Sequence, residues 1–403
     1  MTSVLLLESP HESADDVFAH AGWDVTRVPG ALQGNDLIDA LKGVDIVGIR
    51  SKTHLTREIL QASSHLEAIG AFCIGTNQID LRTASELGIA VFNAPYANTR
   101  SVVELAIAEA IALTRQLPVK NRALQSGVWA KSANGAHEVR GKTLGIVGYG
   151  SIGTQLSVLA EALGMRVVFY DIAEKLAIGN ATRVRSLSQL IAKSDIISIH
   201  VDGRPANDGF FSRDRIMAMK EGSILINLSR GSVVDLDAVY ERLADGSLGG
   251  AGVDVFPSEP DANGDPFTSP LIGMPNVILT PHIGGSTVEA QESIGTFVAD
   301  KLTSYFRKGL TSLSVNMPRV DASPAHSAMH RVAWIHKNTP GALAHVNKIF
   351  ADAGANIDAQ TLATVGDIGY MVTDISSSLP QSALDELTGL PHSIRLRVLH
   401  KDR

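Results

Sequence analysis

The sequence lacks the patterns that form disulfides, structural metal sites and membrane-spanning helices. Its single cysteine, Cys73, excludes a disulfide within the chain, and there is no CxxC or Cys/His cluster for a structural zinc ion. No apolar run approaches the roughly 18 residues that a membrane-spanning helix needs. The opening residues MTSVLLLESPHE carry no basic leader, so we expect a first strand rather than a signal peptide, and a cytoplasmic protein.

Positive charge is also in short supply. The chain has 35 Lys and Arg against 42 Asp and Glu, a formal net charge of −7. Such a chain is a poor electrostatic partner for nucleic acid or an anionic membrane, and we expect neither as a ligand. Neither an HExxH motif nor a carboxylate metal spacing is present, so we expect no metal.

The length of 403 residues predicts two or three domains at roughly 150 residues each. In residues 1–98, short apolar runs at 4–7, 45–49, 65–72 and 89–92 alternate with helical patterns, which predicts a parallel sheet. A largely apolar helix follows, and Ser101 with Glu104 has the spacing of a capping box at its start.

A second series of strands begins at Lys142 and reads TLGIVG, RVVFYD, IISIH, SILINLS, AGVDVF and NVILTPH. We expect residues 99–286 to form a dinucleotide-binding domain and residues 287–318 to return to the first domain, which would then be discontinuous. After a linker at 319–328, residues 329–403 read βαββαβ. The predicted fold is α/β, with two doubly wound Rossmann-like domains and a C-terminal ferredoxin-like domain.

A dinucleotide fingerprint opens the second series. Gly148, Gly150 and Gly153 form GxGxxG between a strand and a helix, which suits a tight turn, a close approach to a pyrophosphate and close packing. Asp171 ends the next strand, where a carboxylate accepts from both ribose hydroxyls and repels a 2′-phosphate. Ile172 and Ala173 bring no cation, so the pattern predicts NAD rather than NADP.

Polar residues end three later strands of the series. Arg230 suits bidentate binding of a 2-oxo acid's carboxylate, His282 suits general acid/base catalysis, and Glu259 would fix the tautomer of that histidine. Asp254 is expected to face the nicotinamide carboxamide. The remaining predicted cofactor contacts lie in the fingerprint or beside the strand ends: Ser151, Ile152, Leu228, Ser229, Gly284 and Gly285.

These motifs resemble one known family over nearly the whole chain. The segments NAPYANTRSVVEL, LGIVGYGSIGTQ, DVFPSEP, TPHIGGS and IHKNTPGALAHVNKIFADAGANI are similar to the D-isomer-specific 2-hydroxyacid dehydrogenases, in the bacterial branch with a C-terminal ACT domain. The resemblance implies NAD-dependent oxidation of 3-phospho-D-glycerate to 3-phosphohydroxypyruvate, the first step of L-serine biosynthesis. It also implies a homo-oligomer, a tetramer or a dimer. Because a second carboxylate can occupy the cationic pocket of the phosphate, we also expect side reduction of 2-oxoglutarate.

The resemblance also assigns residues outside the strand ends. It places the substrate's phosphate on Arg50 and Lys52 and lines the substrate site with Gly75 and Asn98. Lys131, with Trp129, matches a loop that enters a neighbouring subunit's active site in similar enzymes; a solvated loop is an equal alternative. The matched residues for L-serine, a feedback inhibitor bound at a subunit interface, are His336, Asn338 and Asn356.

Three departures from the family pattern stand out. Lys52 replaces an arginine that close relatives often carry, Asp202 replaces a proline, and Ala328-Met329 replaces adjacent hinge glycines. Two other functions remain open. One is a dehydrogenase of another 2-hydroxy acid, and the other is a NAD-sensing binding scaffold; the extra cations and the ACT domain argue against them.

Overall fold

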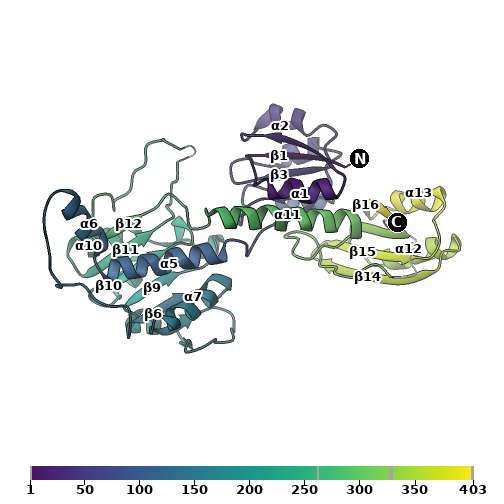
Figure 1. Ribbon diagram of the computed structural model, residues 1–403. Helices are drawn as coiled ribbons and strands as arrows, with labels where there is room; N and C mark the ends of the chain where they lie inside the picture. The colour runs from purple at the N-terminus through teal and green to yellow at the C-terminus, as the bar shows by residue number, and fades with distance from the viewer. Residues whose placement is uncertain (1, 261–262, 326–329, 401–403) are drawn as a thin grey trace. The chain divides into compact units, whose positions relative to one another are not determined.

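The computed structural model describes residues 2–260, 263–325 and 330–400. The chain divides into two compact units, residues 1–97 with 291–403 and residues 98–290 (Figure 1). The chain therefore leaves the first unit and returns to it. The finer boundaries that we predict within the first unit stay predictions, and the Ala328-Met329 pair lies outside the described residues.

The first unit begins with a five-stranded parallel sheet in the order β2-β1-β3-β4-β5. Its strands and helices are β1 (Ser3–Leu7), α1 (Ser13–His20), β2 (Asp24–Val28), α2 (Gly34–Ala40), β3 (Ile46–Ile49), α3 (Arg57–Ala62), β4 (Ala68–Ala71), α4 (Leu81–Glu86) and β5 (Ala90–Asn93). Alternate residues of β1 enter different cores, because successive side chains of a strand point to opposite faces. Val4 and Leu6 pack with α1 and the long helix α11 (Val288–Lys308), whereas Leu5 and Leu7 pack with α2 and α3.

The predicted βαββαβ pattern is confirmed at the C-terminal end of the first unit. Its elements are β13 (His330–Lys337), α12 (Ala342–Asp352), β14 (Ile357–Val365), β15 (Ile368–Ile375), α13 (Gln381–Gly389) and β16 (Ser393–His400). They form an antiparallel sheet in the order β14-β15-β13-β16. Val332 and Trp334 pack with α12 and α13, while Ala333 and Ile335 face the core that contains α11.

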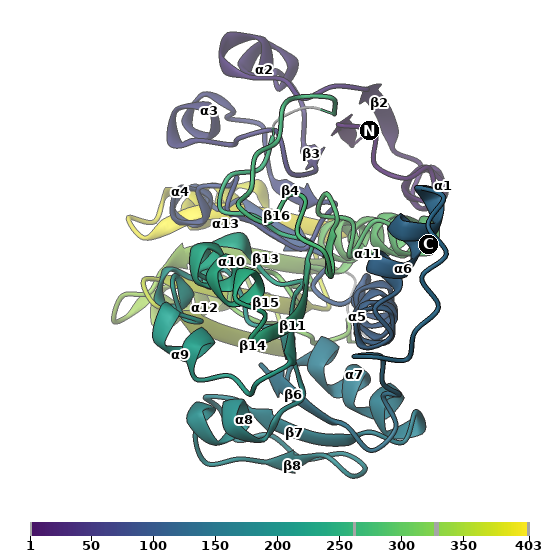
Figure 2. The ribbon, with the colours of Figure 1, turned by 90° about the vertical axis from the view of Figure 1, so that its left-hand side faces the viewer.

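The second unit contains a seven-stranded parallel sheet in the order β12-β11-β10-β9-β6-β7-β8. Figure 2 shows β6, β7 and β8 at one end of this sheet. The strands are β6 (Thr143–Val147), β7 (Arg166–Tyr170), β8 (Thr182–Arg183), β9 (Ile196–Ile199), β10 (Ser223–Asn227), β11 (Leu248–Val253) and β12 (Val277–Leu279). The helices are α5 (Thr99–Thr114), α6 (Leu117–Gln125), α7 (Ser151–Ala162), α8 (Leu187–Lys193), α9 (Arg213–Met217) and α10 (Leu236–Ala244), with 3₁₀ turns at Pro205–Asn207 and Gly231–Val233.

Both faces of this sheet are covered, as expected for a doubly wound fold. Ile146 and Ile196 pack against α5 and α7, and their neighbours Val147 and Ile197 pack against α8 and α10. All six predicted strands form, and β8 is an additional edge strand of two residues.

The predicted capping box at Ser101 is wrong. Helix α5 begins at Thr99, so Ser101 lies inside its first turn, and Asn98 takes the cap position without a side-chain hydrogen bond. The Ser101 hydroxyl is instead 2.8 Å from the hydroxyl of Thr287, and Glu104 pairs with Arg100 at 2.6 Å. The Ser101 hydroxyl, which the local pattern assigned to the helix cap, therefore makes a tertiary hydrogen bond instead.

Across the described residues, no helix has both the length and the apolar character needed to cross a membrane. Within the same part of the chain, His, Cys, Asp and Glu side chains form no group of three or more that could hold a metal ion.

Candidate active site

The fingerprint turn is closely packed at Gly148 and Gly153 and open at Gly150. A Cβ on Gly148, whose φ is +91°, would lie 2.4 Å from the carbonyl oxygen of His200, and one on Gly153 would lie 2.3 Å from that of Gly148. A Cβ on Gly150 would meet nothing within 4 Å. Gly150 is the N-cap of the twelve-residue helix α7, so free space adjoins a helix N-terminus with its N–H donors and partial positive charge. Ser151 and Ile152 form the first turn, and this cradle fits a dinucleotide pyrophosphate.

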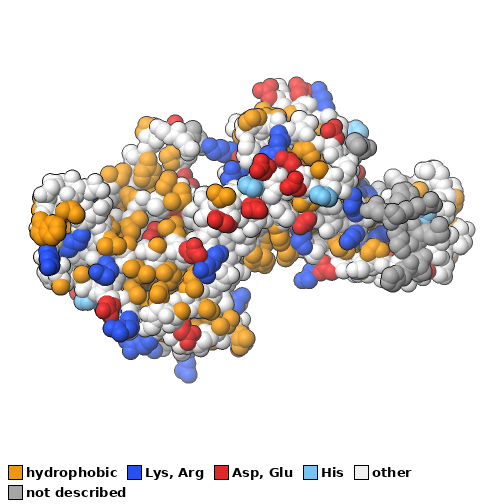
Figure 3. Space-filling view, viewed as in Figure 1, with side chains coloured by type: hydrophobic (Ala, Val, Ile, Leu, Met, Phe, Trp, Pro, Cys, Tyr) orange, Lys and Arg blue, Asp and Glu red, His pale blue; other side chains and the backbone are white. Residues whose placement is uncertain are grey.

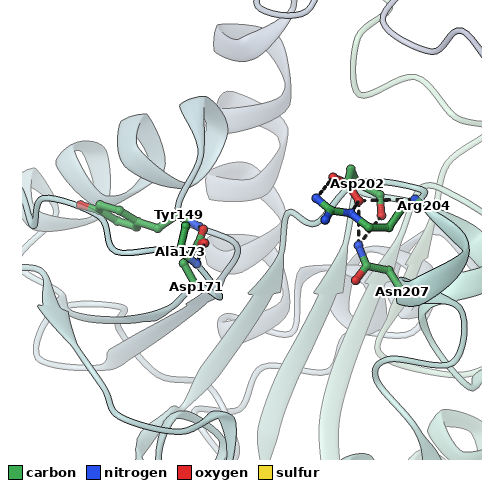
Figure 4. Close-up of polar contacts among 6 residues, drawn as sticks. All are labelled: Tyr149, Asp171, Ala173, Asp202, Arg204 and Asn207. Atoms are coloured by element: carbon green, nitrogen blue, oxygen red, sulfur yellow. Dashed lines mark hydrogen bonds and ion pairs between the residues drawn. The ribbon is translucent and has the colours of Figure 1, made fainter. Parts of the chain in front are cut away.

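Asp171 is fixed beside this turn. Its Oδ2 accepts from the Tyr149 N–H and its Oδ1 from the Ala173 N–H, each at 2.8 Å (Figure 4). A carboxylate accepts about four hydrogen bonds, so it retains capacity for ribose hydroxyls. β6 and β9 adjoin at the point where the strand order reverses, which is where open α/β sheets bind ligands.

Cations do lie near Asp171, although its sequence neighbours bring none. Arg183 donates to the backbone carbonyls of Asp171 and Ala173 at 3.3 and 3.1 Å. The charge of Asp171 contributes to a raised pKa of Arg204, but the guanidinium is paired with Asp202. Its Nε donates to Asp202 at 2.7 Å, and Figure 4 shows this contact. Asn207 also donates to Asp202, at 2.8 Å. Local sequence could not reveal these cations, because they arrive from β8 and from the loop after β9.

Arg230 follows β10 at a point where two chain segments nearly touch. A Cβ on the next residue, Gly231, would lie 1.9 Å from the carbonyl carbon of Phe256. Glycine therefore allows the end of β10 to approach the segment that carries Glu259, and the charge of Arg230 acts on both Glu259 and His282. Arg230 Nη1 donates to the carbonyl of Ser229 at 2.7 Å, and the Ser229 hydroxyl donates to Asn227.

His282 and Glu259 form a hydrogen-bonded pair. Nδ1 of His282 lies 2.8 Å from Oε2 of Glu259, and Oε1 of Glu259 accepts from the Phe256 N–H at 3.1 Å. The backbone of His282 is left-handed, with a φ of +53°. Such a conformation is costly for a non-glycine residue, so the surrounding contacts must hold it.

Asp254 supplies those contacts. Its Oδ1 accepts from the Thr280 hydroxyl at 2.6 Å and the Ile283 N–H at 2.8 Å, and its Oδ2 accepts from the Gly284 N–H at 2.8 Å. Its carbonyl accepts from the His282 N–H at 2.8 Å, and its side chain is buried. Asp254 thus shapes the loop that presents His282, and the predicted contact with the nicotinamide carboxamide stays a prediction.

The pair shifts the pKa values of both its members. The hydrogen bond with Glu259 raises the pKa of His282 above its usual value, outweighing burial and the charge of Arg230, which act in the opposite direction. Burial alone would raise the pKa of Glu259, but the hydrogen bonds from His282 and Phe256 outweigh it and lower that pKa. The imidazolium–carboxylate form is therefore favoured.

Sequence reasoning missed Glu109, a buried acid on α5. Both of its carboxyl oxygens lack a hydrogen-bond partner among the described residues, and burial, with the charge of Asp254, raises its pKa to about 8. A Cβ on Gly252 would lie 2.2 Å from its Oε2, so β11 leaves room for this carboxyl group. A charged residue in the apolar stretch SVVELAIAEAIALT was the available signal.

The other predicted second-unit residues surround these strand ends. Leu228 and Ser229 follow β10, and Gly285 adjoins Gly284 in the His282 loop. A Cβ on Gly285 would lie 2.3 Å from Nδ2 of Asn98, so the predicted substrate residue Asn98 packs against this loop. Lys131 lies elsewhere, in an exposed segment after α6 where Trp129 is 79% exposed and hydrophobic side chains gather (Figure 3).

Three predicted substrate residues belong to the first unit. Arg50 and Lys52 directly follow β3, and Arg50 Nη2 donates to Oε1 of Gln291 at 3.0 Å. The carbonyl of Gly75 accepts from the amide of Gln78 at 3.3 Å.

The three residues predicted to bind serine separate into two groups. His336 is buried over Gly369, with Nδ1 2.9 Å from the carbonyl of Lys337, and Asn338 donates to the carbonyl of Gly366 at 3.1 Å. Asn356 precedes β14, whose first residue pairs with Ile375, whereas His336 pairs with Gly369 at the other end of β15. Within one chain, Asn356 is therefore at the opposite end of the sheet from the other two.

Two segments of the chain match known protein families. Residues 107–284 match the D-isomer specific 2-hydroxyacid dehydrogenase, NAD binding domain family, so this part is an NAD-binding domain. Residues 332–394 match the AHAS small subunit-like ACT domain family.

Relatives of nearly the same length extend the match over the whole chain. A D-3-phosphoglycerate dehydrogenase of Haemophilus influenzae is 49% identical over 98% of this chain and 97% of its own. That of Escherichia coli strain K12 is also 49% identical, with the same coverage. Among solved structures, the D-lactate dehydrogenase of Aquifex aeolicus complexed with NAD and lactic acid covers 78% of this chain and 99% of its own, with a TM-score of 0.69 and 26% identity.

Proposed function

We propose that this chain, which belongs to the D-3-phosphoglycerate dehydrogenase family of D-isomer-specific 2-hydroxyacid dehydrogenases, oxidises 3-phospho-D-glycerate to 3-phosphohydroxypyruvate with NAD. The observation that carries the proposal is the His282–Glu259 pair, presented beside Arg230 in the same unit as the open fingerprint turn. The reaction would supply the first intermediate of L-serine synthesis, in the cytoplasm.

The chemistry assigns one task to each residue. When bound, NAD supplies the acceptor for the hydride on C2 of the substrate. Because Nδ1 of His282 faces Glu259, the neutral ring donates from Nδ1 and offers Nε2 to take the hydroxyl proton. Glu259 then stabilises the resulting imidazolium, and Arg230 holds the substrate's carboxylate with its planar guanidinium.

The fingerprint residues would hold the cofactor in this reaction. The N-terminus of α7, at Gly150, Ser151 and Ile152, would meet the pyrophosphate, and Asp171 the adenine ribose. Arg50 and Lys52 would hold the phosphate, and a second carboxylate could use the same cations, which would permit side reduction of 2-oxoglutarate.

The C-terminal domain would make the enzyme responsive to L-serine. His336 and Asn338 at one end of the sheet, and Asn356 at the other, can meet around one ligand when two copies lie side by side in opposite directions. The proposal therefore includes a homo-oligomer, a dimer or a tetramer. Side-chain amides and an imidazole provide the acceptors and donors that an amino acid needs.

A dehydrogenase of a different 2-hydroxy acid is the alternative, supported by the fold shared with D-lactate dehydrogenase. The test compares kcat/KM for 3-phospho-D-glycerate and D-glycerate by NADH absorbance. A strong preference for the phosphorylated acid is expected, because only the phosphate makes charge-assisted contacts with the two cations. Equal efficiencies would refute the phosphate assignment, and NADH binding without turnover of any 2-hydroxy acid would favour a sensing role.

A further inference from the structure

A carboxylate lies directly behind the two cations assigned to the phosphate. Glu8 is the first residue after β1, and the parallel pairing of β1 with β3 brings it beside the segment that begins at Arg50. Glu8 is half-buried, and its backbone is left-handed with a φ of +63°, followed by Ser9 at +49°. Two successive non-glycine residues in this conformation turn the chain sharply at the end of the strand.

The side chain of Glu8 gathers three backbone N–H groups. Oε1 accepts from Arg50 at 3.2 Å and from Thr53 at 2.8 Å, and Oε2 accepts from Lys52 at 2.9 Å. Such a cluster of N–H groups in a turn is an anion-binding concavity of the kind that often holds phosphate in proteins. Here the chain fills the concavity with an anion of its own.

The same turn is held from a second direction. The carbonyl oxygen of Arg50 accepts from Nε2 of Gln78 at 2.6 Å, so both backbone groups of Arg50 are engaged. Thr53, at the end of the turn, is fully buried, while the side chain of Lys52 is exposed. The backbone of residues 50–53 is therefore fixed, and the side chains of Arg50 and Lys52 extend from a rigid segment.

We propose that Glu8 is a positioning residue for the substrate's phosphate: its carboxylate occupies the N–H concavity of residues 50–53 and leaves the phosphate to the side chains of Arg50 and Lys52. This inference rests on the proposed phosphate contact. With the concavity filled, the backbone offers no second place for the anion, and the cations start from one fixed position, which lowers the ordering cost of binding.

The alternative is that Glu8 is an ordinary surface carboxylate whose charge opposes phosphate binding. The two roles predict opposite results when the charge is removed. Glu12 provides a matched control, because it is an exposed carboxylate four residues along and its side chain makes no capping hydrogen bond at the start of α1.

The experiment measures kcat and KM for 3-phospho-D-glycerate in Glu8→Ala, Glu8→Gln and Glu12→Gln. Loss of an acceptor for three N–H groups should raise KM about tenfold or more in Glu8→Ala, with kcat and the KM for NAD nearly unchanged. Glu8→Gln keeps one acceptor oxygen and should show a smaller rise. Glu12→Gln should match the wild type.

Rescue by sodium formate distinguishes the proposed role of Glu8 from a general loss of structure. Formate can refill the emptied concavity, so it should lower the KM of Glu8→Ala toward the wild-type value and leave the wild type unaffected. A KM that stays unchanged or falls in both Glu8 variants would overturn the proposal, as would a raised KM that formate does not lower. If Glu8→Ala does not fold, the rise in KM of Glu8→Gln decides the question.

The same assay separates this inference from the proposed function. Arg50→Gln should raise the KM for 3-phospho-D-glycerate if the phosphate contact is real. An unchanged KM in that variant would refute the phosphate contact itself, whereas a raised KM there with normal Glu8 variants would refute only the role of Glu8.

Discussion

Replacing Glu109 by glutamine should remove a loss of stability that the wild type shows as the pH rises. Glu109 is buried on α5, neither of its carboxyl oxygens has a hydrogen-bond partner among the described residues, and its pKa is raised from 4.5 to about 8. Burial is the larger cause, because it penalises the charged form, and the charge of Asp254 adds to it. The folded chain therefore keeps a proton that the unfolded chain loses.

The size and sign of the effect follow from this difference. Between pH 4.5 and about 8, Glu109 holds more of its proton in the folded state than in the unfolded state, so its contribution to the free energy of unfolding falls as the pH rises. At 1.36 kcal/mol per pH unit, the difference of about 3.5 in pKa corresponds to about 5 kcal/mol in total. Over two pH units within that range the loss is about 2.7 kcal/mol.

Glutamine has nearly the same shape and does not titrate, so Glu109→Gln should lose this slope. The assay is urea unfolding of the wild type and the variant at several pH values between 5.5 and 7.5. Their difference in unfolding free energy should change by about 1.4 kcal/mol per pH unit, because the other titrating groups are common to both. Glu104→Gln, an exposed position on the same helix, is the control. A difference that does not vary with pH would refute the account of a protonated buried acid.

Two further predictions concern the proposed catalytic pair and the residues proposed to bind L-serine. Glu259→Gln replaces the charged carboxylate that raises the pKa of His282 by a neutral amide, so the acidic limb of the pH profile for NADH formation should move to lower pH, because oxidation needs neutral His282. A limb at the wild-type pH would contradict this coupling. Asn338→Ala with Asn356→Ala should abolish inhibition by L-serine and preserve uninhibited turnover; equal inhibition of both proteins would show that the effector site lies elsewhere.

The strands of the second unit could be predicted because buried parallel strands read as continuous apolar runs. β2 (Asp24–Val28) could not, since its sequence DVTRV alternates polar residues on an exposed edge. The capping box at Ser101 failed for a different reason: a distant threonine on the approach to α11 engages its hydroxyl. Local patterns therefore predict an element better than they predict its ends.

In the candidate site, too, some residues could be predicted from the sequence and others could not. Arg230, Glu259 and His282 were accessible to sequence reasoning because the carboxyl ends of parallel strands share one edge. The partners that tune them were not, since the contacts of Asp254 with residues 280–284 and the burial of Glu109 depend on how distant segments pack. The separation of Asn356 from His336 required the register of β15 with its two neighbours.

The most direct test of the central claim is the rate of NADH formation from 3-phospho-D-glycerate by the wild type and His282→Asn, with NADH affinity measured by fluorescence in parallel. We expect the wild type to turn over and the variant to lose about 10²- to 10⁴-fold in kcat while binding NADH normally. Turnover in the variant equal to that of the wild type would contradict the assignment of His282 as the group that takes the proton.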